Sequence, residues 1–344
     1  MTIPAPPSDL DDLIRVSARL GADPLLIQAA GGNTSVKGSG VMWIKASGML
    51  LADARVREIF VACDLEAIRD AVASGQARAD RPAEFALGEG ALRPSIETSL
   101  HAVFPQRVVV HVHCVNTLAL AIRPDAEAAF AARLGGFDWA IVPYVKPGAN
   151  LARVVKAALG PRTDVVVLRN HGLVVAADSV AEADALLGRV VAALTVPAET
   201  AAPDLPLLEA RAGEGYVPLP ADDPLHAVAC SPRLLDAALA GSLYPDHVIF
   251  CGVGAVALAP GETPGSAARR VAKGVPAPPF LLVPGAGALI GADASEGARA
   301  LARCLGDVLT RLEPGASVVA LTQPQNAELL NWDAEIYRQQ LDAG

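Results

Sequence analysis

The chain has 344 residues, with 28 Lys and Arg against 37 Asp and Glu and a formal net charge of −9. This acidic balance argues against a nucleic-acid partner, although it still allows a local cationic pocket for a small phosphate. Hydrophobic residues make up 52% of the chain and aromatic residues only 4%, so the length allows two domains with cores of Ala, Val and Leu.

The cysteines and the first residues bear on the cellular compartment. The five cysteines are scattered, odd in number and without a Cys-x-x-Cys pair, which is typical of buried thiols in a reducing cytosol. The start, MTIPAPPSDLDD, has neither a basic segment nor an apolar run, so we expect no signal peptide. No apolar run of about 18 residues is free of Gly, Pro and charge. We therefore expect a cytoplasmic protein with no membrane partner.

The N-terminal part predicts a helix followed by two strands. Residues 9–21 have apolar side chains at helical spacing, acidic residues in the first turn and a glycine at the end. LLIQ (25–28) and VMWIKAS (41–47) are predicted as strands around a turn at 31–35. That turn is rich in amides and hydroxyls that can bind phosphate or carboxylate, although composition alone favours a simple tight hairpin. The second small-donor turn, at 45–48, favours the anion-binding interpretation.

Two histidines end the apolar run at 108–116, VVVHVHCVN, which is typical of a buried strand. Strand side chains two positions apart point to the same face, so His111 and His113 converge. Such a pair is half of a zinc site, and taken alone it is equally well explained as two satisfied core histidines. Just upstream, Glu97 lies near the start of a short helical pattern, where it can reach a metal or act as a base.

A third histidine lies in the next apolar segment, VVVLRNHGLVV, at 165–175. A polar triplet within such a run costs desolvation unless its groups are engaged, so Asn170-His171-Gly172 belongs at a turn or a site. We take His171 as the third metal ligand. Three histidines and a carboxylate, with an open coordination position, are what catalytic zinc needs.

Five short motifs in order carry a resemblance to a known family. They are G-N-T-S at 32–35, x-S-G at 46–48, P-S-x-E at 94–97, H-x-H at 111–113 and N-H-G at 170–172. Over about residues 10–200 the chain resembles the class II aldolase/adducin family. The resemblance implies an α/β (α+β) fold, a three-layer αβα domain with a mostly antiparallel central sheet. The C-terminal part resembles the non-dehydrogenase portion of bacterial proteins that fuse such an aldolase to a short-chain dehydrogenase.

The resemblance also implies an activity and a set of site residues. Zn²⁺, or another divalent transition metal, would bind His111, His113 and His171 together with Glu97. The implied reaction is the reversible aldol cleavage of a short ketose phosphate or related hydroxy-keto acid through a zinc-stabilised enediolate, with Glu97 moving a proton. The residues expected to bind the acid group of this small-molecule substrate are Asn33, Ser47, Gly48 and Ser95, with Gly32 and Lys45. Family members are commonly tetramers, so we expect a homo-oligomer.

The chain departs from the family pattern at three points. Lys45-Ala46 stands where the sugar-phosphate aldolases commonly have Thr-Pro, and Ile96 replaces a second serine. These changes suggest a different acid group or a different substrate size. No tyrosine follows His113 at the spacing of the family's proton donor, so the general acid is unassigned.

Other functions remain open at this point. A decarboxylase or epimerase acting on a phosphorylated keto sugar acid would use the same site, and a non-catalytic adducin-like assembly module would use the fold alone. A nicotinamide-dependent dehydrogenase has no credible fingerprint. The G-x-G-x-x-x-G run at 285–291 lies between apolar segments and is better explained as a β-hairpin.

We divide the chain into a catalytic domain at 1–200, a Pro- and Ala-rich linker at 201–224 and a C-terminal α/β domain of unknown role at 225–344. An amphipathic helix at 178–195 closes the first domain. In the C-terminal domain, VIFCG and AVALAP are predicted as strands. His226 and His247 match no ligand motif and are expected to be structural or surface residues. His101 lies four residues after Glu97 on the same side of the predicted helix. It is expected to be a packing or capping residue, with support of the metal ligands as the alternative.

Overall fold

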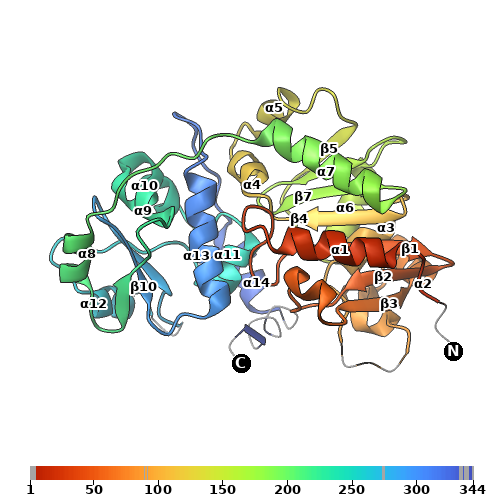
Figure 1. Ribbon diagram of the computed structural model, residues 1–344, viewed down its shortest axis with the longest axis horizontal. Coiled ribbons are helices and arrows are strands. Elements are labelled where there is room, and N and C mark those ends of the chain that lie inside the picture. The colour runs from red at the N-terminus through yellow and green to blue at the C-terminus, as the bar shows by residue number, and fades with distance from the viewer. Residues whose placement is uncertain are drawn as a thin grey trace. The chain divides into compact units, whose positions relative to one another are not determined.

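Two compact units make up the protein in the computed structural model: residues 1–117 with 127–195, and residues 118–126 with 196–344 (Figure 1). Both units mix helices and strands, which confirms the predicted α/β class. In the described part of the chain, no helix is both long and apolar enough to cross a membrane. The structure describes residues 5–88, 90, 92–272, 276–332, 336 and 341–342.

The first unit is built on a seven-stranded sheet in the order β3-β2-β1-β4-β7-β6-β5. Neighbouring strands are antiparallel except for the parallel pair β5 and β6, as predicted for a mostly antiparallel sheet. The strands are β1 Asn33–Gly38, β2 Val41–Lys45, β3 Phe60–Asp64, β4 Val108–Val112, β5 Trp139–Val142, β6 Val165–Leu168 and β7 Gly172–Ala177.

Helices cover both faces of this sheet and complete the predicted three layers. Helices α1 and α7 pack on one face, and α2, α3 and α6 pack together on the other (Figure 1). Their bounds are α1 Leu10–Gly21, α2 Leu65–Ala73, α3 Thr98–Val103, α6 Ala149–Ala158 and α7 Val180–Leu194. The other helices in this part of the described chain are η1 Leu51–Arg55, η2 Ala77–Asp80, η3 Pro82–Phe85, α4 Val115–Ala121 and α5 Ala126–Ala131; α4 passes into the second unit at Leu118.

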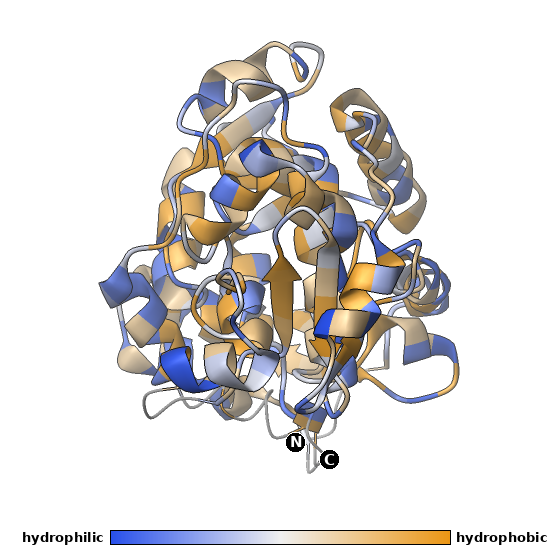
Figure 2. Cartoon of the chain, turned by 90° about the vertical axis from the view of Figure 1, so that its left-hand side faces the viewer, coloured by the Kyte–Doolittle hydropathy of each residue, from blue (hydrophilic) through white to orange (hydrophobic). Residues whose placement is uncertain are grey.

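Apolar burial holds these layers together. Leu100 and Phe104 of the α3 segment pack against Val109 of β4 and against Val155 of α6. Each such fully buried side chain contributes roughly 1.5–3 kcal/mol relative to an exposed one. In Figure 2, which looks from the side where the elements of the second unit are labelled in Figure 1, the strand nearest the viewer is hydrophobic, and hydrophilic residues occur in the helices and turns around it.

The hairpin of β1 and β2 differs from the prediction. LLIQ is not a strand, and Asn33, Thr34 and Ser35 lie within β1 rather than in the turn. The two turn residues are Ser39 and Gly40, with φ of 51° and 76°. A two-residue loop with both residues left-handed matches the right-handed twist of the strands, and it places the turn at residues 39–40 instead of 31–35.

The second unit contains a three-stranded antiparallel sheet in the order β8-β10-β9. The run at 285–291 forms the predicted hairpin between β9 and β10, and Gly285 in the turn has a φ of 78°. The strands are β8 Tyr216–Pro218, β9 Phe280–Val283 and β10 Gly287–Gly291. The helices are α8 Leu205–Arg211, α9 Leu225–Cys230, α10 Pro232–Leu239, α11 Pro245–Cys251, α12 Pro264–Val271, α13 Glu296–Leu309 and α14 Gln323–Leu330.

Three sequence predictions for this unit were wrong in detail. Residues 201–224, predicted as a linker, contain α8 and β8, and β8 pairs with β10. VIFC lies in α11 and Gly252 follows its end, because Pro245 at the first helical turn starts a helix, and a short apolar run fits a buried helix as well as a strand. AVALAP makes one isolated bridge, from Ala257 to Leu282, instead of a strand.

Candidate metal centre

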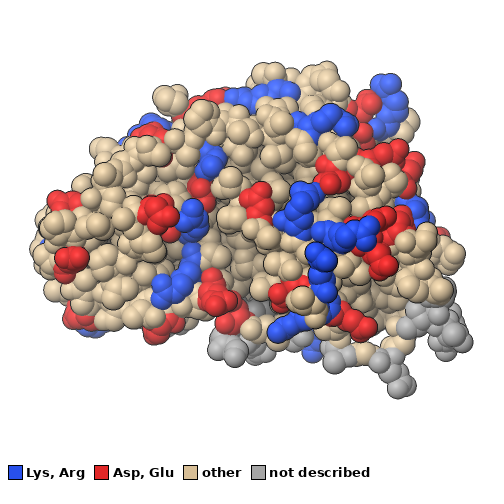
Figure 3. Space-filling model, in the orientation of Figure 1, with Lys and Arg blue, Asp and Glu red and all other residues tan. Residues whose placement is uncertain are grey.

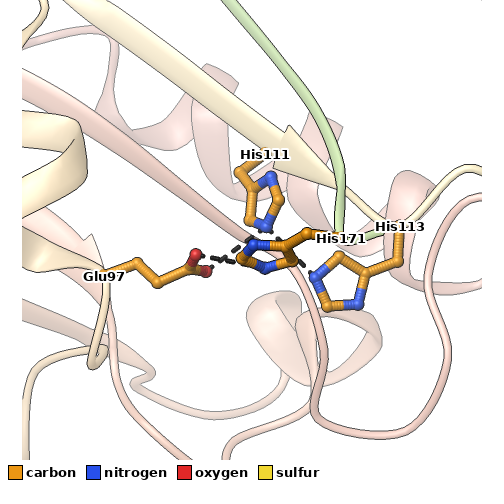
Figure 4. A group of neighbouring side chains, drawn as sticks. All are labelled: Glu97, His111, His113 and His171. Atoms are coloured by element: carbon orange, nitrogen blue, oxygen red, sulfur yellow. Dashed lines mark hydrogen bonds and ion pairs between the residues drawn. The ribbon is translucent and has the colours of Figure 1, made fainter. Parts of the chain in front are cut away.

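Four buried side chains of the first unit meet at one point: Glu97, His111, His113 and His171. One donor atom from each lies within 4.8 Å of the others, and the imidazole centroids are 4.9–5.3 Å apart. Figure 4 shows the carboxylate and the three rings directed toward one another. The structure thus brings together all four residues that the sequence singled out as ligands.

The sheet supplies the three histidines. His111 lies in β4, His113 follows the end of that strand, and His171 lies in the turn between β6 and β7. Asn170 takes a left-handed conformation in this turn, with a φ of 52°, which asparagine tolerates better than most residues. Residues 169–171 thus form a tight turn between β6 and β7 that brings His171 to the end of β4.

Gly172 allows β7 to approach β4 closely beside the two strand histidines. A Cβ atom at this position would lie 2.6 Å from Val112 O, 3.0 Å from His111 Cε1 and 3.2 Å from His113 Cδ2. These separations are shorter than van der Waals contact, so any larger residue would push against both imidazoles.

The protonation of His111 is fixed by its neighbour on β7. Its Nδ1 lies 3.0 Å from Leu173 O, and a carbonyl can only accept, so Nδ1 carries the proton. The lone pair of Nε2 is then directed into the cluster, as for metal-bound histidines whose other nitrogen donates to a carbonyl. His111 Nε2 lies 3.1 Å from His113 Nε2 and 3.3 Å from Glu97 Oε2. His171 Nε2 lies 3.3 Å from Glu97 Oε1.

Glu97 is held at the start of α3 by two polar neighbours. Asn33 Nδ2 donates to Glu97 Oε2 at 2.8 Å and to Ser95 Oγ at 3.1 Å. Ser95 Oγ in turn accepts from the backbone N–H of Glu97 at 3.2 Å. Burial alone would raise the pKa of Glu97, but the three imidazoles and the Asn33 hydrogen bond lower this pKa to about 2. The carboxylate is therefore ionised at neutral pH.

The residues present fit a divalent transition metal. Three imidazole nitrogens and one carboxylate oxygen are a donor set typical of Zn²⁺ and similar ions. Two buried oxygens at the cluster, Glu97 Oε1 and Asn33 Oδ1, make no hydrogen bond within the described residues. Buried polar atoms are rarely left in this state, which is consistent with a cation at this position.

Four of the residues predicted to bind the substrate's acid group lie in two adjacent loops and at the start of β1. Asn33 and Ser95 contact Glu97 or its backbone, as described above. The turn of Ser47 and Gly48 is tied to the Ser95 loop, because Ser47 N–H donates to Arg93 O at 2.8 Å. Gly48 has a φ of 76°, in the left-handed region that favours glycine.

Gly32 packs directly on the histidine strand. Its φ is 59°, and a Cβ atom there would lie 2.3 Å from Ile27 Cδ1 and 2.9 Å from His111 O. Only glycine therefore fits at this position, and its backbone lies against β4.

Lys45, which was predicted to bind the substrate, makes hydrogen bonds to the backbone. Its side chain is buried, and Nζ donates to Ala30 O at 2.7 Å and to Gly32 O at 2.9 Å. Its backbone O also accepts from Ser95 N–H at 3.0 Å. Lys45 therefore ties the loop before β1 to the loop before Glu97, and its charge is engaged by carbonyl groups. The sequence could not distinguish a cation that faces backbone from one that faces a ligand.

The histidines outside the cluster are buried, in agreement with a structural role. In the second unit, His226 Nδ1 accepts from Ala288 N–H at 3.1 Å and Nε2 lies 3.0 Å from Pro220 O. In the first unit, His101 Nδ1 lies 2.7 Å from Ser35 Oγ, a contact that sequence patterns did not indicate.

On the face of the molecule shown in Figure 3, positively and negatively charged residues are interspersed.

The fold and the cluster together define an α/β protein with a buried donor set for a divalent metal. The chain belongs to the Class II Aldolase and Adducin N-terminal domain family, whose sequence model matches residues 11–195. The family resemblance found in the sequence is thereby confirmed. Membership supports an aldolase-type, lyase class of enzyme, and the family match does not extend into the C-terminal part of the chain.

Individual relatives cover about half of the chain. The uncharacterized oxidoreductase YuxG of Bacillus subtilis (strain 168) is 29% identical over 183 residues, which are 49% of this chain and 26% of that protein. The chain therefore matches about a quarter of this curated relative's length. The N-terminal class II aldolase domain of a conserved protein from Thermoplasma acidophilum is 28% identical, covering 56% of this chain and 95% of that chain, with a TM-score of 0.49. L-fuculose-1-phosphate aldolase from Thermus thermophilus is 21% identical, covering 53% and 91%, with a TM-score of 0.35.

Proposed function

We propose that this protein is a metal-dependent class II aldolase, an aldehyde-lyase that cleaves and re-forms a carbon–carbon bond of a short ketose phosphate or related hydroxy-keto acid. The observation that carries this proposal is the meeting of three imidazoles and one carboxylate at a buried point. Family membership supports aldol chemistry at that point.

Each residue has a distinct role in this proposal. His111, His113 and His171 hold Zn²⁺ or another divalent transition metal, with Glu97 as a further ligand. A divalent ion bound there would polarise a carbonyl group and stabilise negative charge that develops on its oxygen. Glu97 accepts a proton from, or returns it to, the carbon beside that carbonyl. Its Oε2 is fixed by Asn33, which leaves Oε1 as the oxygen without a hydrogen bond in the described part of the chain. The residues proposed for the acid end of the substrate are Gly32, Asn33, Ser47, Gly48 and Ser95.

Two variants separate metal binding from chemistry. His113→Ala removes one of three imidazoles, so both bound metal and turnover should be lost. Glu97→Gln keeps all three imidazoles and nearly the same shape, so it should still take up metal when metal is in excess, although with weaker affinity, while turnover falls by roughly 10²–10⁴-fold. Metal is measured by elemental analysis, and turnover by release of dihydroxyacetone phosphate from a panel of ketose 1-phosphates. Full metal content with normal turnover in His113→Ala refutes the ligand set.

A decarboxylase or epimerase acting on a phosphorylated keto sugar acid is the second candidate. Ile96, which stands where the sugar-phosphate aldolases have a second serine, supports a substrate with a different acid group or size, as such a keto acid would be. A substrate panel with and without phosphate distinguishes the two, because carbon dioxide or an epimer would appear without an aldehyde. A purified wild-type protein that binds no divalent metal would favour an adducin-like assembly module.

We further propose a cytoplasmic homo-oligomer, a tetramer, that acts on a small molecule. Light scattering of the purified protein measures its oligomeric state, and a monomer contradicts this part of the proposal.

A further inference from the structure

Strand β1 is buried except at its last residue, Gly38, but carries polar residues at alternate positions. Asn33, Ser35 and Lys37 are all buried, and alternate residues of a strand share one face. Asn33 and Ser35 pair in register with His111 and Val109 of β4, and Val109 packs against α3. The three polar side chains therefore face the layer that contains α3.

Each of these side chains bonds a successive part of the α3 segment. Asn33 Nδ2 donates to Glu97 Oε2, and Ser35 Oγ lies 2.7 Å from His101 Nδ1. Lys37 Nζ donates to the carbonyls that follow the helix, Phe104 O at 2.6 Å and Gln106 O at 2.8 Å. We call these contacts the β1–α3 ladder.

Successive polar groups are spaced by nearly the same distance along β1 and along the α3 segment. Two strand residues advance about 7 Å, and the four residues from Glu97 to His101 advance about 6 Å along a helix. The strand and the helix therefore run in the same direction with their polar groups in step. A shift of α3 by one turn would leave these buried groups unpaired, which is costly.

Apolar contacts define the position of α3 less sharply than this ladder does. Leu100 and Phe104 pack against other apolar side chains, and such contacts are non-directional. Hydrogen bonds between buried groups depend on distance and angle, so they specify one axial position. His101 stays neutral, because burial lowers its pKa to about 3.

We propose that Ser35 and His101 are positioning residues for Glu97. Neither belongs to the four-donor cluster; their hydrogen bond fixes α3 one helical turn from Glu97 and so sets the distance between the carboxylate and the imidazoles. This inference rests on the proposed function, in which Glu97 is a metal ligand and the proton-transfer group.

The test compares two serines that contact the same helix segment. Ser35→Ala removes the contact with His101, and Ser99→Ala removes a buried bond of α3 to Ala79 O that does not involve β1. The affinity of metal-free protein for Zn²⁺ is measured by competition with a chromophoric chelator, and the Co²⁺-loaded forms are compared by visible absorption. We expect Ser35→Ala to bind Zn²⁺ about tenfold more weakly with an altered Co²⁺ spectrum. Ser99→Ala should lose thermal stability but keep the wild-type affinity and spectrum.

A second pair of variants tests the other side of the contact. His101→Asn can place an amide group near the Nδ1 position, whereas His101→Leu cannot, so the first should retain more Zn²⁺ affinity than the second. Equal Zn²⁺ affinities of Ser35→Ala and Ser99→Ala overturn the positioning role. If Ser35→Ala does not fold, equal Zn²⁺ affinities of the two His101 variants overturn it instead. A wild-type protein without Zn²⁺ affinity is a different result, because it refutes the proposed function itself.

Discussion

Gly172 offers a direct test of the geometry of the metal centre. In Gly172→Ala, the added methyl group would lie 2.6 Å from Val112 O and 3.0 Å from His111 Cε1. Because ordinary contacts of a methyl group begin near 3.4 Å, β4 and β7 must separate by several tenths of an ångström. Overpacking of this kind typically costs about 1–3 kcal/mol of unfolding free energy. His113 lies beside the same methyl group, so two of the three imidazoles would be displaced.

The expected loss appears most clearly in the stabilisation that metal provides. At a free metal concentration of about 100 times Kd, binding stabilises the folded protein by about 2.7 kcal/mol. If Gly172→Ala weakens binding about tenfold, the same metal concentration stabilises it by only about 1.4 kcal/mol. Urea unfolding with chelator and with Zn²⁺ measures this increment for each protein.

Gly188 provides the matched control for this prediction. It lies in α7, and a Cβ atom there meets no heavy atom within 4 Å. Gly188→Ala should therefore raise the stability of the metal-free protein by up to about 1 kcal/mol and leave the metal increment unchanged. An equal metal increment in wild type and Gly172→Ala refutes the argument that the close approach at this glycine sets the histidine geometry.

Two further predictions concern buried polar groups. Lys45→Met removes a cation from Ala30 O and Gly32 O. We expect the free energy of unfolding, measured in urea, to fall by about 1–3 kcal/mol, and KM, measured by steady-state kinetics, to rise. An unchanged KM would leave Lys45 with a role in stability alone. Burial lowers the pKa of His247 from 6.5 to about 4 in the folded protein. As the pH drops from about 6.5 toward 4, His247 is therefore protonated in the unfolded chain but not in the folded one, and the free energy of unfolding falls. His247→Phe should reduce that slope by up to about 1.4 kcal/mol per pH unit, and equal slopes in urea unfolding between about pH 7 and pH 5 would contradict the assignment.

The three histidines of the proposed metal centre could be singled out from the sequence because their signals are local. His111 and His113 are two apart in an apolar strand, and His171 lies in a polar triplet that interrupts another apolar segment. Both patterns depend on the alternation of strand side chains and on the cost of burying unpaired polar groups. Neither requires knowledge of which strands are neighbours.

The role of β1 could not be predicted in this way. Its polar residues predicted a loop, because hydrophobic alternation is the usual sign of a buried strand. The partner of Ser35 is His101, 66 positions away, and pairing over such a distance leaves no periodic trace in the sequence. The same limit applies to Lys45. Its partners are backbone carbonyls of the loop before β1, and the sequence does not show where that loop runs.

The register of one pair of strands connects these observations. In the β1–β4 pair, Asn33 lies opposite His111, so both side chains lie on the face where Glu97 is found. A slip of one residue would turn Asn33, Ser35 and Lys37 to the opposite face, because strand side chains alternate. The slip would remove all the hydrogen bonds of the β1–α3 ladder at once and would leave the imidazoles of His111 and His113 without a positioned carboxylate. The geometry of the proposed active site therefore depends on the same register that pairs the central strands of the sheet.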